Sequence, residues 1–207
     1  MDLGVAYLWL GRYQAAFTHF EEFNRKPPRY AITFGMAGAA KWCLSQPEEA
    51  VDQWQAGLKC DFADSGGAGI KIPLLLFFAS ITRPALFPTA RVERLLQERS
   101  QEPRAAIWPG PLAKFVLGQH SDDQLRQECE RHVERYGNDE TPYWHSDFYK
   151  GVLAAKKGDA AHFSDAMKRA AQLTWADFDN RQAEFYAKVW QEEFFLARHE
   201  SSSVGKI

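Results

Sequence analysis

The chain has 207 residues, of which 45% are hydrophobic and 14% aromatic, so it carries enough apolar material for a folded core. Its 25 basic and 27 acidic residues give a net charge of −2. A nucleic-acid-binding protein needs a basic excess to neutralise phosphates, and this chain has none. The composition therefore predicts a globular protein that binds no nucleic acid.

Neither the hydropathy pattern nor the cysteines point to a membrane or to secretion. The longest apolar stretch, residues 72–81, contains Pro73 and falls short of the ~20 residues that a membrane-spanning helix needs. The N-terminus lacks the basic and apolar regions of a signal peptide. Cys43, Cys60 and Cys129 are odd in number and widely spaced, which suits reduced thiols in a cytoplasm. We therefore expect a cytoplasmic protein that does not enter a membrane.

The first elements along the chain are related by a shift of 34 residues. Small residues at the repeated positions predict places where two helices cross closely, and large residues predict packing against the next pair of helices. A pair of short helices cannot bury its apolar face alone, so several pairs must stack. The recurring pairs are Gly4 and Gly38, Ala16 and Ala50, and Phe20 and Trp54.

This pattern resembles the tetratricopeptide repeat family: a Leu-Gly-x-x-Tyr first helix, a turn glycine and an Ala-x-x-x-Phe second helix. In the second copy, Lys41 replaces the tyrosine and Ser45 the turn glycine. A third copy has Phe148-Tyr149-Lys150-Gly151 in its first helix, its turn at Gly158 and Ala170 in its second helix. The resemblance covers residues 3–60 and 145–172, and it implies a right-handed solenoid. That solenoid would comprise about five antiparallel helical hairpins and a C-terminal capping helix.

Between these copies, proline and glycine positions predict the helix boundaries. Residues 72–83 and 89–100 form a predicted helix pair, with Thr89 as the cap of the second helix. Pro111 begins a short helix that Gly118 ends.

Ser121 and Gln124 form a capping-box motif for a helix that reaches about Tyr136. A last helix is predicted over residues 177–198. No segment alternates with period two, so we predict an all-α fold with one domain over residues 1–200 and a flexible tail at 201–207.

Two clusters invite a chemical interpretation. The glycine-rich segment 66–69 follows a predicted helix and lacks the Lys-Ser/Thr of a phosphate-binding loop, so we interpret it as a connection. Cys129 and His132 share a helix face, but zinc needs three or four ligands, and we expect a buried thiol and an exposed histidine. The sequence thus predicts no catalytic residue, no metal and no cofactor.

The family resemblance implies a binding function, because the first helices of stacked hairpins line a concave groove. The partner would be another protein, and the particular hypothesis is a bacterial immunity protein that neutralises a toxin. A generic adaptor or chaperone-like factor is the alternative, as is an enzyme whose site is assembled from distant helices. The groove residues that the resemblance implies are Trp9, Met36, Trp42, His145, Tyr149 and Lys156.

Overall fold

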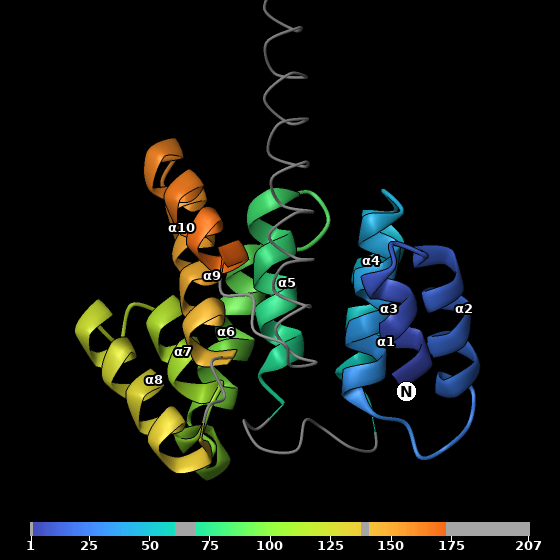
Figure 1. Ribbon diagram of the computed structural model, residues 1–207, viewed down its shortest axis with the longest axis horizontal. Helices are drawn as coiled ribbons and strands as arrows, with labels where there is room; N and C mark the ends of the chain where they lie inside the picture. Colours follow the sequence, from blue (N-terminus) through green and yellow to red (C-terminus); the bar gives the residue numbers. More distant parts are fainter. Residues whose placement is uncertain (1, 61–68, 138–140, 173–207) are drawn as a thin grey trace, which may run out of the picture. The chain divides into compact units, whose positions relative to one another are not determined.

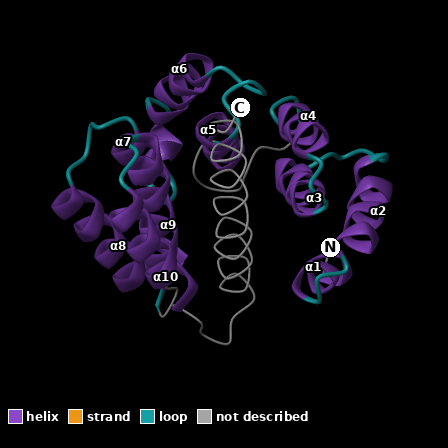
Figure 2. Cartoon of the chain, turned by 90° about the horizontal axis from the view of Figure 1, so that it is seen from above, coloured by secondary structure: helices purple, strands orange, loops and turns teal. Residues whose placement is uncertain are grey.

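A computed structural model describes residues 2–60, 69–137 and 141–172 of the chain. This described part folds into ten α-helices and one short 3-10 helix without a β-strand, which confirms the all-α prediction (Figure 1; Figure 2). The chain divides into two compact units, residues 1–142 and 143–207, which we describe separately. The predicted last helix, the tail and most of the glycine-rich segment lie outside the described residues.

The helices of the first unit follow the predicted order. Their bounds are α1 (Asp2–Trp9), α2 (Tyr13–Asn24), α3 (Ala31–Cys43), α4 (Pro47–Gly57), α5 (Lys71–Thr82), α6 (Thr89–Ser100), η1 (Pro103–Ala106), α7 (Gly110–Val116) and α8 (Asp122–Tyr136). The unit boundary falls within α9 (Thr141–Lys156), and α10 (Ala160–Gln172) belongs to the second unit. Among the described residues, no helix is both long and apolar enough to cross a membrane.

Three helix pairs, α1/α2, α3/α4 and α9/α10, are joined by the same tight turn. In each, one residue takes the left-handed conformation: Gly11 at φ 68°, Ser45 at φ 57° and Gly158 at φ 74°. The next residue donates its N–H to a carbonyl five positions earlier, at 2.8, 3.0 and 2.9 Å respectively, which satisfies an orphan carbonyl of the preceding helix. Ser45 adopts this conformation although it has a side chain, so the turn geometry recurs without its glycine.

The same three pairs share one close helix contact. In each first helix a glycine faces a large side chain 16 residues later: Gly4 faces Phe20, Gly38 faces Trp54 and Gly151 faces Met167. A Cβ atom on any of these glycines would collide with that side chain. The three large side chains are fully buried. The predicted small-residue crossings are therefore present at the predicted positions.

The aromatic core of the first unit forms where α3, α4 and α5 meet. Trp54 donates its indole N–H to the Gly35 carbonyl at 3.1 Å, and its ring stacks on Trp42 with centroids 5.5 Å apart. The Trp42 ring also lies 4.9 Å from that of Phe78 on α5. These contacts join the second helix pair to the helix that follows it.

Lys41 occupies the position at which the repeat pattern has tyrosine, and it is buried. Its ammonium lies 2.8 Å from the Glu49 carboxylate, 3.0 Å from the Gln46 amide oxygen and 4.0 Å from the centre of the Phe17 ring. Phe17 is on α2, Lys41 on α3 and Glu49 on α4. One cation thus links three successive helices.

One predicted helix cap is confirmed and another is wrong. Ser121 accepts from the Gln124 N–H at 3.2 Å and donates its own N–H to the Gln124 side chain at 2.8 Å, which completes the capping box. Thr89 does not cap α6, because Pro88 precedes the helix in an extended conformation. The Thr89 hydroxyl instead donates to the Ser80 carbonyl on α5 at 3.4 Å, since helix packing offers it a partner there.

Replacing Gly38 by leucine tests the helix crossing. The new side chain meets the Trp54 indole, and overpacking of this kind costs ~1–3 kcal/mol, so the melting temperature of Gly38→Leu should fall by several degrees. Ala56→Leu, on the exposed side of α4, is the matched control and should melt close to the unchanged protein. Equal melting of both variants in a calorimeter would contradict the crossing.

The buried cation gives a second stability prediction. Glu49→Gln leaves the Lys41 ammonium, whose side chain is 9% exposed, without its carboxylate, whereas Lys41→Met removes the charge and keeps the stem. Since Glu49 is half-exposed, we expect its loss to cost about 1 kcal/mol in urea unfolding, and Lys41→Met to be neutral or stabilising. Glu48→Gln, its exposed neighbour on the same helix turn, should change little. A larger loss for Lys41→Met than for Glu49→Gln would refute this account.

Candidate functional site

The groove residues predicted in the first unit lie in its core. Met36 is 5% exposed and Trp42 3% exposed, and the Trp42 indole packs between Trp54 and Phe78. Trp9 is the last residue of α1, and its side chain lies outside the described atoms. In this conformation Met36 and Trp42 therefore present little surface to a partner.

The other three predicted groove residues lie on α9 in the second unit. His145 is half-buried, with its ring centroid 3.8 Å from that of Trp144. Tyr149 is 3% exposed and meets Phe148 edge-on at 5.1 Å, whereas Lys156 is exposed at the end of the helix. The six residues thus divide between two separately described units, and their shared role in one groove stays a prediction.

Two pockets elsewhere in the described chain are lined by exposed aromatic side chains. Among the large hydrophobic residues of the described chain, the exposed aromatics are Phe23 at 41%, Tyr30 at 38% and Tyr136 at 51%. Phe23 and Tyr30 line a pocket between α2 and the connection to α3, and Tyr136 lines another beside α8. Exposed aromatics at concave places are the usual anchors of binding surfaces. The first of these pockets, the α2–α3 pocket, is the larger and is our candidate site.

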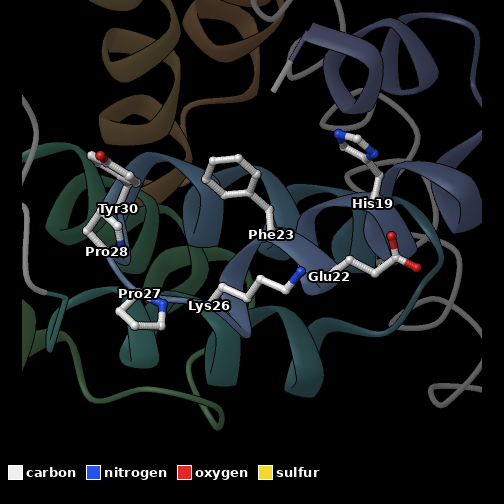
Figure 3. Close-up of a pocket in the computed structure, with 7 residues that line it drawn as sticks. All are labelled: His19, Glu22, Phe23, Lys26, Pro27, Pro28 and Tyr30. Carbon is white, nitrogen blue, oxygen red and sulfur yellow. The ribbon is translucent and has the colours of Figure 1, made fainter.

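The α2–α3 pocket has a volume of about 440 Å³ and mostly apolar walls. The Phe23 and Tyr30 rings lie 6.4 Å apart at a tilt of 45°. Figure 3 shows Phe23 between Tyr30 and His19, with Lys26 and Glu22 along the opposite side. The full set of lining residues is His19, Glu22, Phe23, Lys26, Pro27, Pro28 and Tyr30.

Local sequence explains why the chain leaves a hollow at this point. Helix α2 ends at Asn24, and Pro27-Pro28 cannot continue a helical ladder because proline has no N–H to donate. Tyr30 is extended and caps α3. The Thr33 hydroxyl then holds the connection between α2 and α3 in place, since it hydrogen-bonds to the Tyr30 carbonyl at 2.7 Å and to the buried Asn24 side chain.

The polar groups of the pocket are one acid, one base and one imidazole. Glu22 and Lys26 are exposed and lie four residues apart on α2, which places them on the same helix face. The Nε2 atom of His19 is buried and has no hydrogen-bond partner within the described structure. The apolar walls of the pocket and these polar groups suit a ligand that has an apolar side chain flanked by polar groups.

Titratable and metal-ligating side chains elsewhere in the described chain have structural roles. In the second unit, Asp159 precedes α10 and accepts from the His162 backbone N–H at 3.1 Å, as an N-cap does. That bond and the His162 ring at 2.6 Å hold the pKa of the Asp159 carboxyl below its ordinary value. Within the described residues, no three His, Cys, Asp or Glu side chains gather as a metal site would require. Cys129 is buried as predicted.

Sequence reasoning missed the exposed Phe23–Tyr30 pair, the exposed Tyr136 and the place of His132. Phe23 follows Ala16 by seven residues, so the helical period puts both on one stripe and predicts burial for each. In the structure, Phe23 is 41% exposed near the end of α2. His132 was expected to be exposed, but it is half-buried between the Trp108 and Tyr136 rings. For Phe23 and Tyr30, the available signal was their position on either side of Pro27-Pro28.

No protein-family model and no curated protein matches the chain.

Proposed function

We propose that this chain is a protein-binding module of the tetratricopeptide type. The observation that carries the proposal is the α2–α3 pocket, where two neighbouring aromatic rings remain exposed over a hollow beside two prolines. The recurring turn and the recurring glycine contact support the repeat resemblance, because both occur at the spacing of that pattern. Repeat modules of this kind offer extended surfaces to other proteins.

The dimensions and chemistry of the pocket favour a peptide segment as the ligand. A volume of about 440 Å³ accommodates a few side chains. The Phe23 and Tyr30 rings offer stacking surfaces, and Glu22 and Lys26 can pair with charges that flank an inserted side chain. The ligand would therefore be an apolar residue within a polar segment of a partner protein.

The narrower form of the proposal is that the partner is a toxin that this chain neutralises. Its support comes from the sequence alone, which predicts a single stack of helical hairpins over residues 1–200. A generic adaptor would use the same pocket, so pocket geometry does not separate the two. Separating them requires a cellular readout.

Removing the exposed aromatics should weaken partner binding without unfolding the protein. Phe23→Ala and Tyr30→Ala each remove a ring that is about 40% exposed, so melting should change little. If the pocket is a binding centre, at least one variant should weaken binding by ~2 kcal/mol, about thirty-fold, by calorimetric titration of a partner captured by the unchanged protein.

Leu10→Ala is the matched control, because Leu10 is 67% exposed and lies outside the pocket. Its affinity should equal that of the unchanged protein. Equal affinity for all three variants would place the partner elsewhere on the chain and end the proposal for this pocket.

The toxin hypothesis predicts protection of living cells. Cells that express the chain should survive the cognate toxin, and Phe23→Ala or Tyr30→Ala should reduce survival in step with the lost affinity. Toxins encoded beside the gene are the ones to test first. Protection against none of them would leave the adaptor function.

A further inference from the structure

A second pocket lies between η1, the start of α7 and the outer face of α8. It has a volume of about 270 Å³, and we call it the α7–α8 pocket. Its aromatic wall consists of Trp108, His132 and Tyr136. The His132 ring lies 6.4 Å from Trp108 and 4.6 Å from Tyr136, so the three rings form one continuous surface.

The spacing of the α8 residues explains why they share this pocket. Positions 131, 132, 135 and 136 follow position 128 by three, four, seven and eight residues, which places all five on one helix face. Tyr136, at the end of that face, is 51% exposed, more than any other described aromatic residue. An exposed aromatic side chain at the rim of a ring-lined hollow is suited to hold a ligand side chain.

The charges of the α7–α8 pocket do not balance. Glu128 pairs with Arg131 at 2.9 Å, and this pair is neutral. Arg135 lies with its guanidinium 5.4 Å from the Tyr136 ring and makes no ion pair with a described residue. One positive charge therefore remains, on a chain whose net charge is −2.

We propose that the α7–α8 pocket binds an acidic segment of a partner protein. An aromatic side chain of that segment packs against Trp108 and Tyr136, and an adjacent carboxylate pairs with Arg135. Arginine suits this role because its planar guanidinium binds carboxylates in a fixed geometry and stacks on aromatic rings. The inference rests on the proposed function in that the ligand is a protein, but it does not depend on the α2–α3 pocket.

Peptides test the site directly. The probe is a fluorescein-labelled ten-residue peptide with the core Glu-Phe-Glu, titrated into the full chain and followed by fluorescence anisotropy. Two matched peptides replace this core by Gln-Phe-Gln and by Glu-Ala-Glu. Both should bind at least tenfold more weakly than the probe, since the site uses one charge and one ring. Binding should also weaken as salt is raised, because Arg135 is exposed and screened.

Variants of α8 assign the binding to the pocket. Arg135→Gln should lower the affinity for the probe at least tenfold, and Arg135→Lys should keep part of that affinity. Arg126→Gln is the control, because Arg126 pairs with Asp123 and does not line the pocket. Both positions are exposed, so circular dichroism should show unchanged folding for all three variants. Equal affinity of Arg135→Gln and Arg126→Gln would overturn the proposal.

Two further results separate this proposal from its competitors. Phe23→Ala should leave probe affinity unchanged, so failure of the α2–α3 pocket and failure of the α7–α8 pocket give different outcomes. A single-stranded oligonucleotide is the competing anion. Tighter binding of the oligonucleotide than of the probe would refute the acidic-peptide assignment, because aromatic rings with arginine also stack on bases.

Discussion

The fold depends on the close approach of two helix backbones at a glycine. In three helix pairs, the glycine of the first helix leaves room for a large side chain 16 residues later, and no Cβ atom fits there. This contact fixes how near the helices lie and which residues of the second helix face inward. With the crossing fixed, the turn between the helices takes one conformation in all three pairs, even where serine replaces glycine. The buried positions follow from this geometry.

Successive pairs are joined by interactions that the glycine contact places in register. Because Gly38 admits the Trp54 indole, that ring reaches the Gly35 carbonyl and stacks on Trp42. Lys41, one residue before Trp42, then contacts the Phe17 ring on α2 and pairs with Glu49 on α4. The end of α3 is therefore held against α2 and α4. At the other end of α3, the Thr33 hydroxyl bonds to the Asn24 side chain at the end of α2, and the proline turn that lines the α2–α3 pocket joins the two helices there.

The sequence predicted what short-range geometry controls and missed what depends on tertiary contacts. The glycine period, the Ser121 capping box and the helix bounds follow from local sterics and hydrogen bonding, so the pattern was sufficient. Thr89 was predicted to be a cap because threonine favours that position. In the structure its hydroxyl instead donates to the Ser80 carbonyl of the adjacent helix. Trp42, predicted as a groove residue from the repeat alignment, packs against Phe78 of the next helix and is 3% exposed, so its role in a groove stays a prediction.

The binding free energy that the exposed aromatic rings can supply is small, so charged groups must contribute to partner binding as well. Burying a large apolar side chain contributes ~1.5–3 kcal/mol, and rings already about half buried retain only ~1 kcal/mol of that gain. Ring–ring contact adds ~0.5–1.5 kcal/mol. One pocket therefore supplies only part of the cost of associating two molecules. The remainder must come from directional polar contacts. The α2–α3 pocket offers a base and an acid for this, and the α7–α8 pocket an unbalanced arginine, so the two pockets would select partner segments of different charge.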